Sequence, residues 1–153
     1  DQVQVDGLQD GRLHQSGQIH MTSEEFRAAV FAEIRNWAAA SFPTLPVVYE
    51  NGPVPDEDKI GPIWLDVEIR WYDGSVAALG STPRTRDFGA VSLSCFYKVG
   101  EGTKSPGQVI DSVSALLQAR RFGSAVMGAR KRTVPTNLRG WHKTGVLIPF
   151  TLG

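Results

Sequence analysis

The chain has 153 residues, of which 41% are hydrophobic and 21% are charged, and this composition is typical of a globular protein with one or two domains. Its formal net charge is zero, from 16 Lys and Arg against 16 Asp and Glu, which argues against bulk electrostatic capture of nucleic acid or of an anionic membrane. The single cysteine, Cys95, excludes an intramolecular disulfide and cannot build a zinc site alone.

The zero net charge hides a segregation of charge along the chain. Residues 1–83 have 5 basic and 13 acidic side chains, a balance of −8. Residues 84–153 have 11 basic and 3 acidic side chains, a balance of +8. Such a chain can present opposite charges to two partners or to copies of itself.

Residues 1–20 differ from the rest of the chain. They are rich in Gln, Asp and Gly, and their apolar residues follow no regular period. The segment lacks the basic start and apolar core of a signal peptide. In the rest of the chain, no apolar run is long enough to span a bilayer. A Met stands at position 21, directly before a helix start. We interpret residues 1–20 as a vector-derived or disordered leader, the alternative being a native arm that orders on a partner, and residues 21–153 as a single α+β domain.

A first helix is predicted near residues 22–40. Thr22 and Glu25 fit a capping box, in which Thr22 is the N-cap and the Glu25 side chain reaches back to the N–H of Thr22. Pro43 ends the helix because it pushes the preceding residue out of the helical region. Apolar residues recur at spacings of four and three and form one stripe, namely Phe26, Val30, Ile34 and Trp37.

Strands are predicted in the next part of the chain. A β-branched run at 45–49 is followed by an Asn-Gly-Pro turn. Residues 63–71 alternate between apolar and polar side chains, which predicts a half-buried strand. A stretch rich in Gly, Ser, Thr and Pro at 73–83 is typical of a mobile hairpin loop. The alternation then resumes over 90–99.

A second helix is predicted over residues 105–123, with a Ser-Pro start, a terminal Gly, and Arg120 and Arg121 in its last turn. Two further strands are predicted near 124–134 and 141–150. The order of elements is therefore αβββαββ. Because the helices do not alternate regularly with the strands, we expect an α+β fold with two helices packed on one face of a largely antiparallel, mixed β-sheet.

No segment matches a motif for catalysis or for metal binding. Gly100–Ser105 lies between a strand and a helix, but it lacks the glycines that a phosphate-binding loop requires. Asp66 and Glu68 share the polar face of one strand, and an exposed charged face explains them more simply than acid–base catalysis. Cys95 alternates onto an apolar face and is predicted to be inert core. We therefore predict no catalytic residue, no metal site and no cofactor.

A cluster of basic residues near the C-terminus is the strongest functional signal. Seven Lys and Arg fall within residues 120–143, which contain no acid. The cluster suits a solvated face, a contact for an acidic protein, or a nucleic-acid contact, although stacking aromatics are scarce nearby. We predict a protein interface because the charges gather near a loop and at element ends. The predicted interface residues are Arg84, Arg86, Arg120, Arg121, Arg130, Lys131 and Arg132.

The order and spacing of several segments resemble a known family. An amphipathic helix opens at 23–37, and the Pro-Val-Val-Tyr-Glu-Asn-Gly segment follows at 46–52. A strand at 91–99 leads through Gly-Glu-Gly into the second helix, and a Gly-Trp-His-Lys strand ends in Ile-Pro-Phe at 140–150. In these features residues 21–153 resemble the tail terminator, or tail completion, proteins of long-tailed phages, the group of minor tail protein U. Residues 1–20 have no counterpart in that pattern.

The resemblance implies a structural protein without catalytic activity. Family members form a hexameric ring that caps the tail tube, stops tail polymerisation and joins the tail to the head connector. The expected partners are further copies of the chain, the tail tube protein and the head–tail connector protein, with the monomer possible in dilute solution and nucleic acid disfavoured. The expected location is the virion tail, and the host cytoplasm during assembly. A ring needs heterologous contacts, and the segregated charges could set their register.

Two other functions stay open at the level of sequence. The chain could be a small α+β ligand-binding or enzymatic domain with a polar site near the 73–87 loop, lined by Asp66, Glu68, Arg84 and Arg86. It could also bind nucleic acid through residues 120–143.

Overall fold

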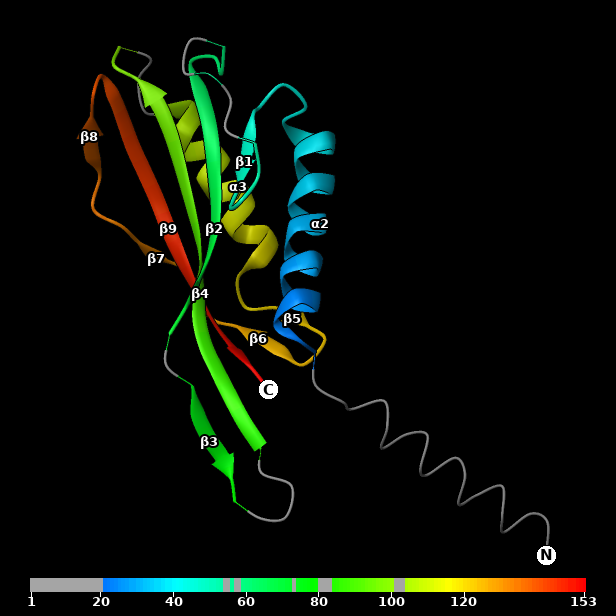
Figure 1. Ribbon diagram of the computed structural model, residues 1–153. Coiled ribbons are helices and arrows are strands. Elements are labelled where there is room, and N and C mark those ends of the chain that lie inside the picture. The colour runs from blue at the N-terminus through cyan, green and yellow to red at the C-terminus, as the bar shows by residue number, and fades with distance from the viewer. Residues whose placement is uncertain (1–20, 54–55, 57–58, 73, 80–83, 101–103) are drawn as a thin grey trace, which may run out of the picture.

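The computed structural model describes residues 21–53, 56, 59–72, 74–79, 84–100 and 104–153 (Figure 1). Residues 1–20, which we interpreted from the sequence as a leader, and part of the Gly100–Ser105 loop lie outside these residues. The described residues form two helices and nine strands. In chain order these are α2 (Ser23–Ser41), β1 (Val47–Tyr49), β2 (Ile63–Trp71), β3 (Ser75–Ala78), β4 (Arg84–Lys98), α3 (Lys104–Leu117), β5 (Arg121–Phe122), β6 (Ala125–Met127), β7 (Lys131–Arg132), β8 (Thr136–Leu138) and β9 (Trp141–Leu152).

Helix α2 follows the capping prediction with one difference. The Thr22 hydroxyl oxygen accepts a hydrogen bond from the Glu25 backbone N–H at 3.1 Å. The Glu25 carboxylate accepts from the Thr22 hydroxyl, also at 3.1 Å, instead of from the backbone of the cap. The predicted apolar stripe is buried against the sheet, together with Phe31.

Helix α3 ends earlier than predicted. Its last residue is Leu117, and the prediction that it extends to Gly123 with Arg120 and Arg121 in its last turn is wrong. Ala119 adopts a left-handed φ of 52°, and its N–H donates to the carbonyl of Gly128 at 3.1 Å. This bond turns the chain out of the helix and into β5. Gly123, with φ of 57°, lies instead in the turn between β5 and β6.

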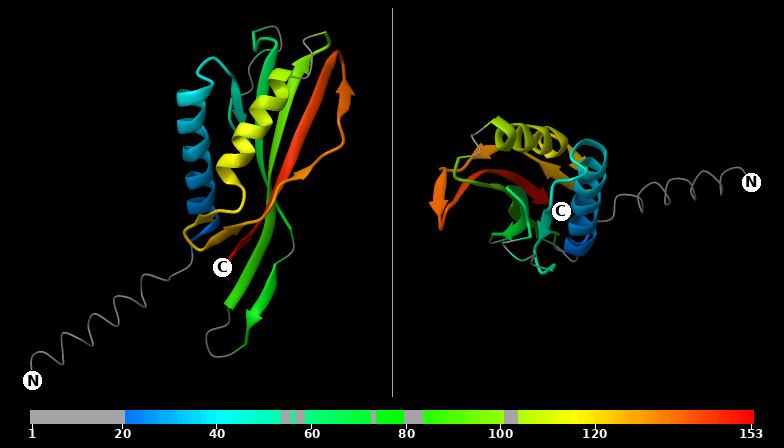
Figure 2. Two further views of the ribbon diagram at one scale, coloured as in Figure 1. Left: turned by 180° about the vertical axis from the view of Figure 1, so that it is seen from behind. Right: turned by 90° about the horizontal axis from the view of Figure 1, so that it is seen from above.

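The sheet is mixed and mostly antiparallel, as predicted. Its main path is β1-β2-β4-β9-β6-β5, and β1 with β2 is the parallel pair among the described strands. Strands β7 and β8 also pair with β9. The region predicted as one strand at 124–134 is therefore divided among shorter strands that follow one another along β9. Both helices lie on one face of the sheet (Figure 2).

The predicted loop at 73–83 contains a strand. Strand β3 pairs with the first residues of β4, so β4 begins at Arg84 instead of near Ala90. We call this hairpin, formed by 75–78 and 84–86, the arm. Figure 1 shows that it extends beyond the layer covered by the helices. The turn-forming composition of the segment concealed the pairing, because a strand of four residues gives little alternation to detect.

The hydrophobic core fills the space between the helices and the sheet. Alternate residues of β2, β4 and β9 point into it, as the period of two predicts, and those of β2 are Leu65, Val67 and Ile69. Phe26 of α2 packs on Phe150 of β9 with ring centroids 4.4 Å apart. The other side chains of these strands point to the opposite face, which the helices leave uncovered.

Candidate protein-binding face

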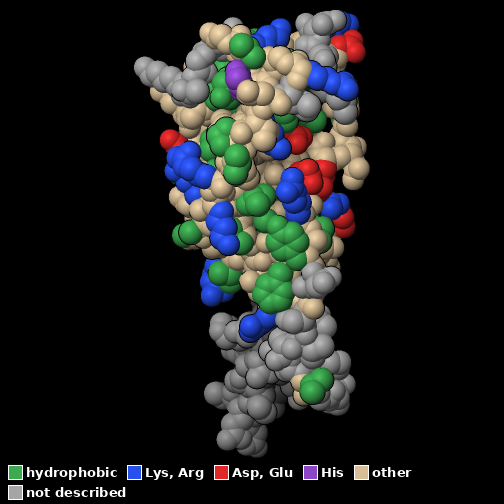
Figure 3. Space-filling model, turned by 90° about the vertical axis from the view of Figure 1, so that its left-hand side faces the viewer, with side chains coloured by type: hydrophobic (Ala, Val, Ile, Leu, Met, Phe, Trp, Pro, Cys, Tyr) green, Lys and Arg blue, Asp and Glu red, His purple; other side chains and the backbone are tan. Residues whose placement is uncertain are grey.

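The face of the sheet that points away from the helices is the candidate functional site, and we call it the outer face. Figure 3 views the molecule from this side and shows hydrophobic side chains along its middle, with basic side chains beside them. Within the described part of the chain, neither helix covers this surface (Figure 2). The register places on it Trp64, Asp66, Glu68 and Arg70 from β2, Phe88, Phe96 and Lys98 from β4, and Trp141, Lys143, Leu147 and Pro149 from β9.

Three aromatic side chains meet at one end of the outer face, and we call them the aromatic cluster. Trp64 and Phe96 are cross-strand partners whose rings stack at 4.3 Å with an interplanar angle of 9°. Trp141 meets Trp64 edge-on at 6.4 Å. All three are half-buried, so the cluster presents apolar area to solvent at a place where no described residue covers it.

Two lysines lie over the rings of the aromatic cluster. The Nζ atom of Lys98 is 5.6 Å from the ring centroid of Trp141, and the Nζ atom of Lys143 is 5.8 Å from that of Phe96. Both distances are within the range of cation–π attraction. The contacts hold the two ammonium groups at the edge of the apolar area, so this end of the outer face is both aromatic and cationic.

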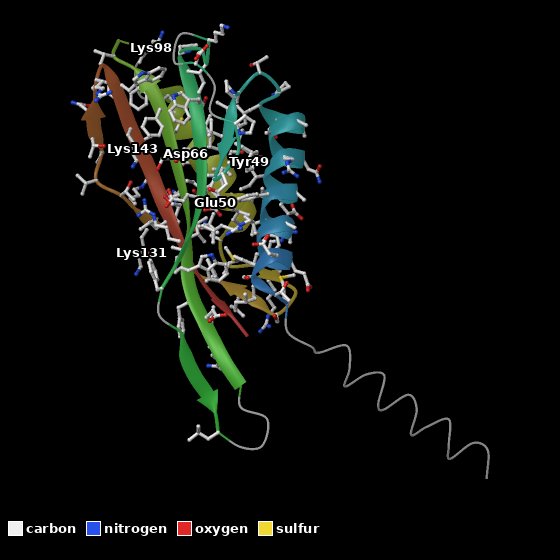
Figure 4. The ribbon with its side chains drawn as sticks, in the orientation of Figure 1. Tyr49, Glu50, Asp66, Lys98, Lys131 and Lys143 are labelled. Carbon is white, nitrogen blue, oxygen red and sulfur yellow. The ribbon has the colours of Figure 1, made fainter. Side chains whose placement is uncertain are left out.

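Acidic side chains lie further along β2, beyond Trp64. Glu68 forms an ion pair with Arg70, with Oε1 and Nε 3.2 Å apart. Burial raises the pKa of the Asp66 carboxyl above its ordinary value, the neighbouring Glu68 raises it further, and Lys143 opposes the shift. Figure 4 labels Asp66 on β2, and Lys143 and Lys131 on β9 and β7 of the same face. The outer face therefore has its carboxylates on β2, and most of its cations on the β4, β9, β7 and β5 side.

The predicted interface residues divide between two sides of the molecule. Lys131 pairs with Leu147 of β9, and Arg121 pairs with Val126, so both share the outer face, and both are exposed. Arg86 lies exposed on the arm, and the side chain of Arg84 lies outside the described residues.

The remaining three predicted residues face the helices and form ion pairs. Arg120 lies 3.0 Å from Glu33 of α2. Arg130 and Arg132 both contact Asp111 of α3, at 2.7 and 3.4 Å. The hydrogen bond from Arg130 holds the pKa of the Asp111 carboxyl below its ordinary value. These arginines connect the helices to the sheet region, a role that sequence reasoning missed because it depends on the register of β7 against β9.

The polar site proposed near the 73–87 loop is not assembled in this fold. Asp66 pairs with Ser94, and Arg86 lies eight residues earlier on the same strand. At about 3.3 Å of rise per residue, the two positions are about 26 Å apart along β4. Residues 80–83 of that loop lie outside the described residues. Asp66 and Glu68 are thus brought to the aromatic cluster and its lysines instead of to the arginines of the arm.

The described residues give little support for a metal site, a reactive cysteine or a membrane-spanning helix. They contain no group of three His, Cys, Asp or Glu side chains that could hold a metal ion. The Cys95 side chain is fully buried on the core side of β4, and burial raises the pKa of its thiol to about 12. None of the helices in the described ranges is long and apolar enough to cross a membrane.

Comparisons with known proteins identify the fold but no family. No protein-family model matches the chain, and no curated protein matches it. A solved structure that has no functional name shares the fold with a TM-score of 0.67 and 18% identity, covering 87% of this chain and 96% of that chain. A chain of the virion of a native gene transfer agent particle matches with a TM-score of 0.52 and 12% identity, covering 82% of this chain and 92% of that chain. At such identities the likeness establishes the α+β fold alone.

Proposed function

We propose that this chain is a non-enzymatic structural protein of a virion. The observation on which the proposal depends is the fold that it shares with a chain of a gene transfer agent particle over 82% of its own length. The geometry agrees with such a role, since the described residues offer a broad uncovered sheet face and a projecting arm (Figures 1 and 3). Broad surfaces of this kind suit contacts between proteins in an assembly.

Within that class, we propose that the protein completes the tail. It would form a ring on the end of the tail tube, stop tube polymerisation and offer its other side to the head connector. The partners would be further copies of the chain, the tail tube protein and the connector protein, in the virion tail and in the host cytoplasm during assembly. The resemblance of residues 21–153 to tail terminator proteins supports this finer role, and the arm gives each subunit a means to reach its neighbour.

A capping assay tests the proposed function. Tail tube protein is allowed to polymerise with and without the purified chain, and tube lengths are measured by electron microscopy. We expect shorter tubes with added density at one end, and a ring-sized species in sedimentation velocity at high protein concentration. Unchanged tube lengths at a molar excess of the chain would contradict the tail role. Failure of the labelled chain to join any particle would also contradict the broader virion role.

A further inference from the structure

The cations of the outer face form a regular series. Lys143 lies on β9, Lys131 lies on β7 opposite Leu147, and Arg121 lies on β5 in the row of Thr151. These rows are four residues apart along β9, which is about 13 Å at the rise of an antiparallel strand. Each cation is also one strand further from β4 than the last. The three charges therefore follow a diagonal line beside the apolar middle of the sheet.

The carboxylates on the same face leave these cations available to a partner. Glu68 is paired with Arg70, and the pairs that hold Arg130 and Arg132 lie on the helix side. Lys131 and Arg121 have no ion-pair partner among the described side chains. The outer face thus has unneutralised positive charge next to an uncovered apolar strip, formed by Phe88, Leu147 and Pro149.

The aromatic cluster favours a protein over a nucleic acid as the occupant. One face of the Trp64 ring is taken by Phe96, and ammonium groups lie over the rings of Phe96 and Trp141. Bases stack on free ring faces, and these contacts reduce the free area.

We infer that the outer face binds an acidic, partly apolar protein segment, whose carboxylates meet Lys143, Lys131 and Arg121 and whose apolar side chains lie on the aromatic cluster and the strip below it. An extended segment with carboxylates at every fourth residue has the same repeat of about 13 Å. Charge complementarity of this kind sets orientation and register. The inference deepens the proposed function and rests on it, because it names the partner chemistry of the protein-binding face.

A designed peptide tests this inference. The probe is a fluorescent twelve-residue peptide of three Glu-Ser-Leu-Ser repeats, in which Glu and Leu share one face of the extended chain, and binding to the full chain is measured by anisotropy at moderate salt. Lys131→Glu is the test variant, because its exposed side chain makes none of the described ion pairs. Arg35→Glu, at an exposed position of α2 beside Tyr49 and away from the outer face, makes the same change in charge and is the matched control. Melting curves confirm that both variants fold.

We expect Lys131→Glu to weaken peptide binding at least tenfold and Arg35→Glu to change it less than twofold. A peptide with Lys in place of Glu should not bind, and binding should change the fluorescence of Trp64 and Trp141. Equal loss in both variants, or no binding of the Glu peptide, overturns the inference. Tighter binding of an oligothymidine of equal charge assigns the face to nucleic acid instead. Dimerisation that Lys131→Glu abolishes, without peptide binding, assigns it to a second copy.

The result of the peptide-binding test can be separated from the result of the capping assay. If the peptide binds but the chain neither caps tubes nor joins particles, the proposed function fails and the inference about the face holds. If capping is normal in Lys131→Glu and the peptide does not bind, the inference fails and the proposed function holds.

Discussion

Among the described groups, Cys95 is the one whose pKa differs most between the folded and the unfolded protein. Its thiol is fully buried on β4, and burial raises its pKa to about 12 from an unfolded value near 9. The unfolded state therefore loses the proton first. Stability that is complete below about pH 9 should decline as the pH rises toward 12, with a slope that approaches about 1.4 kcal/mol per pH unit.

The measurement is urea unfolding of the wild type and of Cys95→Ala at pH 7, 9, 10 and 11. At pH 7 the variant should be less stable by about 1 kcal/mol, because a buried side chain is shortened. Above pH 9 the difference should shrink and then change sign, since the variant has no thiol to ionise. Parallel pH profiles for the two proteins would contradict the buried thiol.

Asp66 gives a second residue-scale prediction, on the opposite face of the sheet. Burial is the main cause that raises the pKa of its carboxyl, so the native state holds the proton more tightly than the unfolded state does. The associated stability is present below the unfolded pKa, near 3.8, and is lost as the pH rises through the folded pKa. Asp66→Asn should therefore stabilise the protein at pH 7, by less than about 1 kcal/mol after solvent screening. The gain should vanish near pH 3, and a gain in melting temperature that is larger at pH 3 than at pH 7 would refute the argument.

Alternation in the sequence was sufficient to place side chains on the two faces of the central strands. It placed Leu65 and Cys95 in the core, where they are buried. It did not show that Ser92 and Ser94, on the other face of β4, are also buried, at 5% and 4% exposure. Small side chains in the middle of a sheet are shielded by their neighbours on β2 and β9, and that shielding depends on register, which alternation does not encode.

At the scale of elements, long periodic segments were predictable and short ones were not. The strand Ile63–Trp71 and helix α2 have many residues that repeat one pattern, so composition and period agree. The end of α3 depends on one long-range bond from Ala119 to Gly128, and the arm depends on pairing between two short stretches. Neither contact has a local signal in the sequence.

Substitution of two glycines by alanine tests how closely the elements pack around β4 and α3. A Cβ on Gly89 of β4 would lie 2.3 Å from the Arg70 carbonyl oxygen and 2.6 Å from Phe150. Gly107 of α3 has nothing within 4 Å of the same position. Gly89→Ala should therefore destabilise the protein by about 1–3 kcal/mol through overpacking. Gly107→Ala should stabilise it by about 0.5–1 kcal/mol, because alanine favours the helix.

Chemical denaturation measures both glycine variants under one set of conditions. Equal effects of the two substitutions would show that the close approach of β4 to β2 and to Phe150 does not constrain the sheet.

At the scale of the whole molecule, the acidic and basic halves of the sequence do not fold into one acidic and one basic surface. Arg120 from the basic half, in the turn after α3, pairs with Glu33 of α2 from the acidic half. Arg130 and Arg132 share the single carboxylate of Asp111, one of the few acids of their own half. That this basic region contacts a protein stays a prediction from the sequence, and which of its cations face outward follows from pairing of β5, β6 and β7 with β9.

This division predicts different outcomes for charge reversal at neighbouring positions. Arg130→Glu with Arg132→Glu places two carboxylates beside Asp111, so this variant should be less stable than the wild type through lost pairs and new repulsion. Lys131→Glu changes an exposed side chain on the outer face, and its unfolding free energy should stay within about 0.5 kcal/mol of the wild type. In the capping assay, Lys131→Glu should impair assembly at full stability.

Comparing stability with capping separates the two roles of these cations. Urea unfolding gives the stability of each variant, and tube length at a saturating protein concentration gives its capping activity. If the double variant caps poorly only at temperatures where it begins to unfold, its arginines serve the fold. If it is as stable as the wild type and still fails to cap, Arg130 and Arg132 contact a partner directly and their pairs with Asp111 are dispensable. Normal capping by Lys131→Glu would remove the outer face from the assembly interface, because that substitution reverses the central charge of the series from Lys143 to Arg121.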